Sequence, residues 1–171
     1  MENMIDVAPY QVVKTESVLC LLQRAVTSIA NSWGKLILVI GVAGNGKTQI
    51  LRKYASDYEL PLLSLGLLIT RAMQSGLQPE KLIGYLHQSM ENLGEVVLLD
   101  NIEILFQPDL KLHVLQLLKL LSKERTIIAA LPGRIVGGSL VYADASHPEY
   151  KVFSQYEIKD LIIFDLNGEL K

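Results

Sequence analysis

The sequence predicts an α/β domain of three layers, in which helices cover both faces of a parallel sheet of about five strands. Short apolar runs alternate along the chain with segments whose apolar residues repeat at helical spacing. Most of these runs are apolar throughout, which is typical of parallel strands buried on both faces. Strands are predicted over residues 36–40, 62–65, 96–100, 126–131 and 160–166.

The segments between the strands complete this architecture. An irregular arm is expected over residues 1–14, followed by a leading helix over residues 15–32. A hairpin is predicted around Gly137 and Gly138. Because the chain ends shortly after the last strand, we expect a single domain over residues 1–171 with no C-terminal helical lid. Further helices are predicted over residues 48–58, 66–75, 80–92 and 109–122.

Composition bears on the partners of the chain and on its compartment. The net charge of −2 gives no support for a nucleic-acid face, although a local basic patch leaves DNA contact open. No apolar run approaches the ~18 residues of a membrane span. The first residues, with Glu2 and Asp6, lack the basic start and apolar block of an export signal. A single cysteine, Cys20, is expected to pack in the leading helix, which fits a reducing cytoplasm.

The most informative stretch is GVAGNGKT, which spells G-x-x-x-x-G-K-T between a predicted strand and a predicted helix. Glycines let the backbone approach a polyphosphate closely, and the start of the helix adds free N–H groups and the positive end of its dipole. A glycine-rich β-to-α turn that happens to spell the motif is the structural alternative. The candidate nucleotide-binding residues are Gly41, Val42, Ala43, Gly44, Asn45, Gly46, Lys47, Thr48 and Gln49.

Two side chains of this P-loop have distinct predicted roles. Lys47 is expected to reach the β and γ phosphates of a bound nucleotide. The Thr48 hydroxyl is expected to bind Mg²⁺, which prefers a few protein oxygens together with phosphate and water. The cofactors predicted by the motif are therefore a nucleoside triphosphate and Mg²⁺. Because the guanine-binding motif N-K-x-D is absent, ATP is favoured over GTP.

A second motif, VVLLDNIE, ends a predicted strand on Asp100. The carboxyl ends of parallel strands meet at the edge where α/β sheets bind ligands, so Asp100 is the candidate partner of Thr48 in holding Mg²⁺. Asn101 follows, and it can position a water by hydrogen bonding but cannot take its proton. Glu103 lies about one helical turn on, where it either activates water or serves as a first-turn acid of the next segment.

This pattern resembles the AAA+ ATPases, whose sheet has the strand order 5-1-4-3-2. Two features depart from that resemblance. AAA+ proteins usually place a glutamate where this chain has Asn101, and a polar residue at the end of the fourth strand, where this chain has Ala129, Ala130 and Leu131. Arg134, in the loop that follows, is a candidate for contacting phosphate in its own site or, as an arginine finger, in that of a neighbouring subunit. A solvated loop arginine is the alternative.

The segments GVAGNGKT, VVLLDNIEILF, RTIIAALPG, GGSLVYAD and HPEYK together resemble the BrxF-type P-loop proteins of BREX bacteriophage-exclusion systems. The resemblance covers residues 36–166. It implies an ATP-binding component of a defence system that works beside a larger ATPase, a DNA methyltransferase and a phosphatase-like protein. It also assigns Gly41, Gly44, Gly46, Lys47, Thr48 and Asp100 to nucleotide and Mg²⁺.

The function predicted from these observations is ATP binding with slow hydrolysis, coupled to assembly with itself or with defence partners. Lys47, Glu103 and Arg134 are the candidate catalytic residues. A nucleotide-gated interaction module without turnover is one alternative. A small-molecule kinase is another, but such kinases usually need an arginine-rich lid, and the arginines of this chain are not clustered. Trp33, just before the first strand, either covers an adenine or packs in the core.

Overall fold

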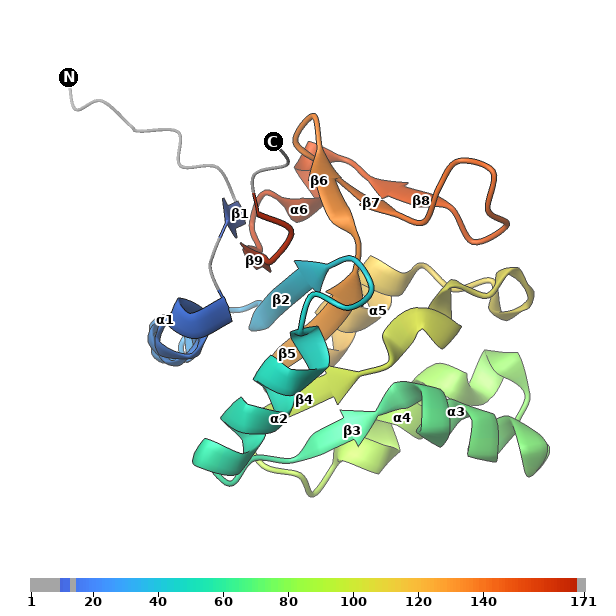
Figure 1. The fold of residues 1–171 in the computed structure, drawn as a ribbon. Coiled ribbons are helices and arrows are strands. Elements are labelled where there is room, and N and C mark those ends of the chain that lie inside the picture. The colour runs from blue at the N-terminus through green and yellow to red at the C-terminus, as the bar shows by residue number, and fades with distance from the viewer. Residues whose placement is uncertain (1–9, 13–14, 169–171) are drawn as a thin grey trace.

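The chain folds into three layers around one parallel sheet, with a small second sheet at its edge, as a computed structural model shows (Figure 1). The structure describes residues 10–12 and 15–168, and the side chains from residue 17 onward. Most of the predicted irregular arm therefore lies outside the described residues. Residues Tyr10–Val12 of that arm form a short strand, β1.

The bounds of the helices and strands follow the chain. The α-helices are α1 (Thr15–Ile29), α2 (Lys47–Asp57), α3 (Leu65–Gln74), α4 (Leu82–Met90), α5 (Val114–Leu121) and α6 (Gln155–Ile158). Short 3-10 helices are η1 (Pro79–Lys81), η2 (Ile102–Phe106) and η3 (Pro108–Leu110). The strands are β1, β2 (Leu36–Gly41), β3 (Leu62–Ser64), β4 (Val96–Asp100), β5 (Thr126–Pro132), β6 (Arg134–Val136), β7 (Ser139–Tyr142), β8 (Lys151–Phe153) and β9 (Ile162–Asp165).

The larger sheet has the order β1-β9-β2-β5-β4-β3 in the described chain, and every adjacent pair is parallel. The five predicted strands correspond to β2, β3, β4, β5 and β9, so the expected order 5-1-4-3-2 is confirmed. Strand β1 extends the sheet beyond β9. Because all of these strands are parallel, their carboxyl ends meet at one edge, and that edge carries both sequence motifs.

Alternate residues of the central strands pack into two separate cores. Leu38 and Ile40 of β2 face the core under α3, α4, α5 and η2, whereas Ile37 and Val39 face the core under α1 and α2. All four side chains are fully buried. Burial on both faces explains why β2 reads as a continuous apolar run, and each such aliphatic side chain stabilises the fold by about 1.5–3 kcal/mol.

A smaller antiparallel sheet, ordered β6-β7-β8, follows β5 directly. Its first two strands form the hairpin predicted around Gly137 and Gly138, whose φ values of 55° and 79° suit a tight turn between antiparallel strands. Strand β8 and helix α6 were not predicted. Both are only three or four residues long, too short to carry a readable periodicity.

Several sequence expectations are corrected by the structure. Helix α1 ends at Ile29, three residues before the predicted boundary at 32. Cys20 is exposed, because the buried stripe of α1 passes through Val18 and Leu22. Trp33 neither packs in the core nor approaches the P-loop: its side chain is 96% exposed and precedes β2 at the opposite edge of the sheet.

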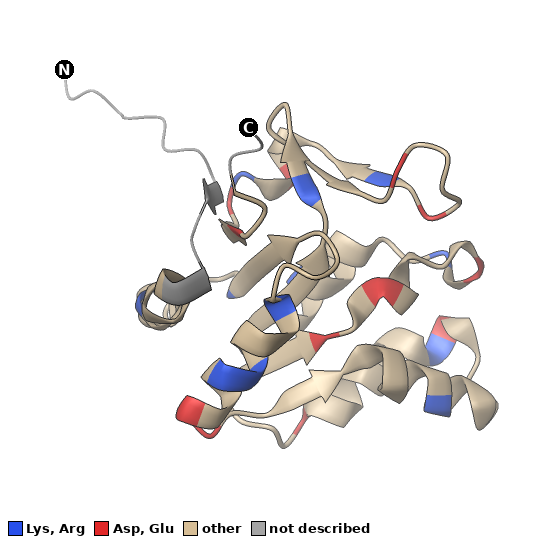
Figure 2. Cartoon of the chain, in the orientation of Figure 1, with Lys and Arg blue, Asp and Glu red and all other residues tan. Residues whose placement is uncertain are grey.

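The predicted helix over residues 109–122 is shorter in the structure. Helix α5 covers Val114–Leu121, because Lys111 adopts a left-handed conformation with φ 49° after η3 and interrupts the helical path. In the view of Figure 2, basic and acidic residues are spread over several helices and loops, and α2 combines Lys47, Arg52 and Lys53 with Asp57. In the described part of the chain, no helix combines the length and hydropathy that a membrane crossing requires.

Candidate functional site

The predicted phosphate-binding loop joins the end of β2 to the start of α2 (Figure 1). Gly44 and Gly46 have φ values of 86° and 82°, a region in which side chains are disfavoured. Gly46 immediately precedes α2, and no side chain caps the helix. The first amide groups of α2, including those of Thr48 and Gln49, are therefore left for an external acceptor such as a phosphate.

Lys47 folds back over this loop. Its Nζ donates hydrogen bonds to the carbonyl oxygens of Gly41 and Val42, at 2.6 Å and 2.9 Å. Burial lowers the pKa of Lys47 from its ordinary value of 10.5, while the carboxylates of Glu103 and Asp100 act in the opposite direction. The ammonium group thus lies within electrostatic reach of both acidic residues that the sequence singled out.

Thr48 and Asp100 come together at the carboxyl edge of the sheet. The Thr48 hydroxyl donates a hydrogen bond to Asp100 Oδ1 over 3.2 Å, although 51 residues separate them in the chain. Asp100 ends β4 and is only 6% exposed, and the backbone N–H of Asn101 donates to the same carboxylate oxygen at 2.9 Å. A buried, oriented carboxylate beside a hydroxyl supplies the two protein oxygens that Mg²⁺ uses next to a P-loop.

The chain turns sharply after Asp100. Asn101 has φ 52°, and η2 starts at the next residue, so Glu103 lies one short turn beyond the end of β4. The side-chain amide of Asn101 donates to Ser64 Oγ at 2.9 Å, which ties the end of β4 to the end of β3. Glu103 is exposed at the same edge. Its side chain is free to act on a bound nucleotide, whereas the Asn101 amide already has a protein partner.

A surface pocket of about 340 Å³ adjoins Glu103, and its lining includes Thr70, Asn101, Gln107 and Glu149. Glu149, from the loop between β7 and β8, was not singled out by the sequence. It accepts a hydrogen bond from the Tyr142 hydroxyl at 2.9 Å. Burial, followed by this bond and by the nearby carboxylates of Glu149 and Glu103, raises the pKa of Tyr142. The small sheet therefore brings a second carboxylate to the cavity of Glu103.

Arg134 is the first residue of β6, and Gly133 alone separates it from the end of β5. Its guanidinium pairs with the exposed carboxylate of Asp144 at 3.1 Å. The structure thus places a cation just after β5, the fourth predicted strand along the chain, as the sequence suggested. Within its own chain, however, this cation pairs with Asp144. Contact with a neighbouring site stays a prediction.

A polar residue just after β9, Asn167, contacts the P-loop, and the acid that ends β9 contacts Asn167. Asp165 is 5% exposed, and Asn167 accepts a hydrogen bond from the backbone N–H of Val42 at 2.8 Å. Neither residue was predicted from the sequence. A signal was present, because the run Ile162–Asp165 repeats the pattern of Val96–Asp100, in which an apolar strand ends in an acid at the ligand-binding edge.

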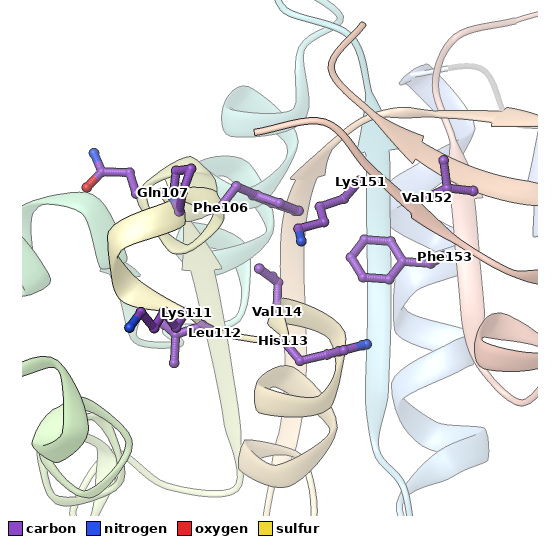
Figure 3. A pocket seen from close by; sticks show the side chains of 10 residues that line it. Phe106, Gln107, Lys111, Leu112, His113, Val114, Lys151, Val152 and Phe153 are labelled. Atoms are coloured by element: carbon purple, nitrogen blue, oxygen red, sulfur yellow. The ribbon is translucent and has the colours of Figure 1, made fainter. Parts of the chain in front are cut away.

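A second cavity, of about 440 Å³, lies apart from the P-loop. Strand β8 flanks it on one side and the segment 106–114 on the other (Figure 3). Lys111, His113 and Lys151 line it together with Phe106 and Phe153, and none of its lining residues is acidic. None of them belongs to residues 41–49 or to the end of β4, although Gln107 lines both this cavity and the pocket of Glu103.

Solved structures with a similar arrangement include PCH-2 from C. elegans, at 16% identity and a TM-score of 0.45, covering 90% of this chain and 42% of that one. Aquifex aeolicus DnaA bound to AMPPCP has 18% identity and a TM-score of 0.43, covering 71% of this chain and 40% of that one. Domain III of Thermotoga maritima DnaA has 14% identity and a TM-score of 0.46, with coverages of 90% and 66%. This chain thus spans less than half of the first two proteins.

Comparison of the sequence with known proteins and with protein families gives two results. No curated protein matches this sequence. The family described as "ATPase family associated with various cellular activities (AAA)" matches residues 37–131, which are more than half of the chain. The matched segment begins in β2, ends in β5, and contains the P-loop together with Asp100 and Glu103. The chain therefore belongs to the AAA family.

Proposed function

We propose that this protein binds ATP with Mg²⁺ at the P-loop and hydrolyses it slowly. The observation that carries the proposal is the contact of Thr48 with the buried carboxylate of Asp100, next to the uncapped start of α2. A glycine-rich turn without a ligand would not need a buried acid at this point. The P-loop lysine, the hydroxyl and the acid are the parts that nucleotide-binding proteins of this class assemble.

The donor set fits Mg²⁺. Thr48 would supply a hydroxyl oxygen and Asp100 a carboxylate oxygen, leaving other positions to phosphate and water, as Mg²⁺ prefers. In the described residues, no group of three or more His, Cys, Asp or Glu side chains could hold a metal without such help. Mg²⁺ bound there would neutralise phosphate charge, while Lys47 and the amide groups of α2 bind and orient the phosphates.

Hydrolysis requires a base for the attacking water. Glu103 is the best-placed group, since it is exposed at the cavity that Asn101 also lines and is close enough to influence the pKa of Lys47. Asn101 is a poor substitute, because its amide has no basic group and donates to Ser64. With one exposed carboxylate and an apolar end to β5, we expect turnover well below that of a fast motor protein.

A nucleotide-gated module without turnover is the second candidate. The same contact of Asn101 with Ser64 favours it, because the position that usually carries a catalytic glutamate in AAA+ proteins instead links two strands. In that case nucleotide would set the arrangement of the edge and a partner would supply catalysis. The two candidates predict the same binding and differ in phosphate release.

We also propose that the protein assembles with itself and acts in a BREX-type defence system. Self-assembly would let Arg134 act in a neighbouring site once its pairing with Asp144 is exchanged for phosphate. The defence role is supported by the sequence resemblance, whose late segments form β5, the β6–β7 hairpin and the loop that carries Glu149. A cytoplasmic location fits the single cysteine. No feature of the charge distribution supports DNA as the partner.

Phosphate release from purified protein tests the activity. Wild type should release phosphate from Mg-ATP, with a rate per subunit that rises with protein concentration. Lys47→Ala should bind nucleotide only weakly, and Glu103→Gln should bind but not turn over. Tight binding without release in any preparation would select the gated module, and no binding by wild type would contradict both candidates.

Partner binding needs a separate experiment. The chain would be co-expressed with the larger ATPase, the methyltransferase and the phosphatase-like protein of a BREX system and purified through a tag. We expect at least one of these proteins to co-purify with wild type, and less of it with Lys47→Ala. Absence of all three from the purified wild type would contradict the defence role and leave the ATP-binding proposal standing.

A further inference from the structure

Asn167 joins three segments that meet at the P-loop. Its Oδ1 accepts hydrogen bonds from the Val42 backbone N–H at 2.8 Å and from Asn45 Nδ2 at 3.0 Å. Its Nδ2 donates to the Gly133 carbonyl at 2.9 Å and to Asp165 Oδ1 at 2.7 Å. The side chain thus connects both ends of loop 41–46 to the residue that follows β5 and to the acid that ends β9.

The orientation of the Asn167 amide is fixed by Asp165. Asp165 Oδ1 also accepts a hydrogen bond from the backbone N–H of Asn167 at 2.9 Å. Because an ionised carboxylate only accepts hydrogen bonds, the nitrogen end of the Asn167 side chain must face it. The oxygen end then points at the P-loop. Asp165 is buried, and its Oδ1 accepts hydrogen bonds from both the backbone and the side chain of Asn167.

The contact has a consequence for phosphate binding. A P-loop binds phosphate through backbone N–H groups that converge on one point, and each residue that rotates out of place removes a donor. In this loop the Val42 N–H donates a hydrogen bond to Asn167. The bond fixes the end of β2, and the position of that end sets where the amide groups of the following loop residues lie. Ordering the loop in the folded chain means that its conformational entropy is not lost again on binding.

We propose that Asn167 is a positioning residue for the P-loop, oriented by Asp165, and that it holds the loop ready for nucleotide without touching the phosphates. The proposal rests on the proposed function in that the ligand of the loop is a nucleoside triphosphate. Such a role also explains how this chain orders the site although β5 ends in apolar residues. The polar side chains that order the loop, Asp165 and Asn167, come from the end of β9 and the residues after it, and not from β5.

Hydrogen exchange without nucleotide tests the contact itself. Asn167→Ala should speed exchange of the amide groups in loop 41–46 about tenfold, corresponding to one lost hydrogen bond, and leave the strands unchanged. Asn92→Ala is the matched control, since Asn92 is exposed in the turn before β4. Unchanged exchange in the loop would overturn the proposal whether or not the chain binds ATP.

Nucleotide affinity, measured with a fluorescent ATP analogue and Mg²⁺, tests the consequence. Asn167→Ala should weaken binding about tenfold. Asn167→Asp keeps the acceptor for Val42 but sets a second carboxylate beside Asp165, so its affinity relative to wild type should recover as the pH falls from about 8 to about 5 and protonation restores a donor. A purely steric role of this residue would show no such pH dependence.

The outcomes separate this proposal from the proposed function. If wild type binds and both variants bind equally well at every pH, Asn167 does not position the loop. If wild type does not bind nucleotide, the proposed function fails, and the exchange experiment alone decides whether the contact orders the loop. If Asn167→Ala does not fold, Asn167→Asp supplies both measurements.

Discussion

The hydroxyl of Thr48 donates a hydrogen bond to Oδ1 of Asp100 at 3.2 Å, linking the first turn of α2 to the end of β4. Neither residue is near the other in sequence. Their contact arises because β2 and β4 lie on either side of β5 and end at the same edge. This pair is the core of the candidate Mg²⁺ site, and its chemistry can be tested without changing its shape.

Asp100→Asn should remove the Mg²⁺ dependence of ATP binding. The amide oxygen can still accept from Thr48, but the negative charge is lost, and hydrogen bonds and contacts to charged groups are worth about 1.5–3 kcal/mol, or about tenfold to a hundredfold in affinity. Titrations with a fluorescent ATP analogue, with Mg²⁺ and with a chelator, measure this. Thr48→Ser is the control that keeps the hydroxyl. Equal Mg²⁺ dependence in Asp100→Asn and wild type would contradict the site.

As the pH rises, ATP affinity should begin to fall below pH 10.5, the ordinary pKa of a lysine. Burial lowers the pKa of Lys47 from 10.5, so the ammonium form that attracts phosphate is lost earlier as the pH rises. The phosphates keep a constant charge above about pH 7, so they do not contribute. Binding measured between about pH 7 and about pH 10 checks this. Lys47→Ala should bind weakly and show no such decline.

Glu103→Gln should reduce phosphate release by at least about a hundredfold while leaving ATP binding intact, because general-base catalysis contributes about 10²–10⁴ in rate. Glu149→Gln is the matched control from the same cavity, and we expect a much smaller loss because its carboxylate is engaged by Tyr142. Single-turnover assays compare the two. Similar losses in both variants would mean that Glu103 has no special role as the base.

Arg134→Ala should abolish the rise of activity with protein concentration if the guanidinium completes a neighbour's site, a contribution of about 10³ or more in rate. Asp144→Ala removes the partner of Arg134 within the chain and should keep or increase that rise. Specific activity measured over a wide range of protein concentration gives both answers. A flat profile in wild type would show that each chain works alone.

Alkaline unfolding should depend on Tyr54. Burial, with a smaller contribution from Tyr58, raises the pKa of Tyr54 to about 12, and its hydroxyl donates to Gln23 at 2.6 Å. Because the folded pKa lies above the unfolded value of about 10, this stabilisation is complete below pH 10 and is lost as the pH rises toward 12. Tyr54→Phe should cost about 1 kcal/mol at neutral pH and weaken the alkaline loss.

Urea unfolding at about pH 8 and about pH 11 measures this effect. Tyr156→Phe is the matched control, since Tyr156 is 84% exposed at the start of α6. If Tyr54→Phe loses as much stability between these two pH values as wild type does, the tyrosine is not the group responsible.

Much of the fold was predictable because its signals are local. Strand β2 and helix α2 flank the glycines of the P-loop, and burial on both faces produces the apolar runs of β4 and β5. The hairpin at Gly137 and Gly138 was predictable for the same reason, since two adjacent glycines suit a tight turn. The errors fall where a short element or a single left-handed residue decides, as at Lys111 before α5.

The three-layer class and the meeting of Lys47, Thr48 and Asp100 at one edge of the sheet could be predicted from the sequence, because the P-loop motif and the apolar strand patterns are formed by neighbouring residues. The meeting of Glu149 and Glu103 at one cavity and the contact of Asn167 with the P-loop could not be predicted from the sequence and follow from the fold. Those contacts join segments that are far apart in the chain. Their geometry follows from how β9 and the small sheet pack beside β2 and β5, and a local sequence pattern carries no information about that packing.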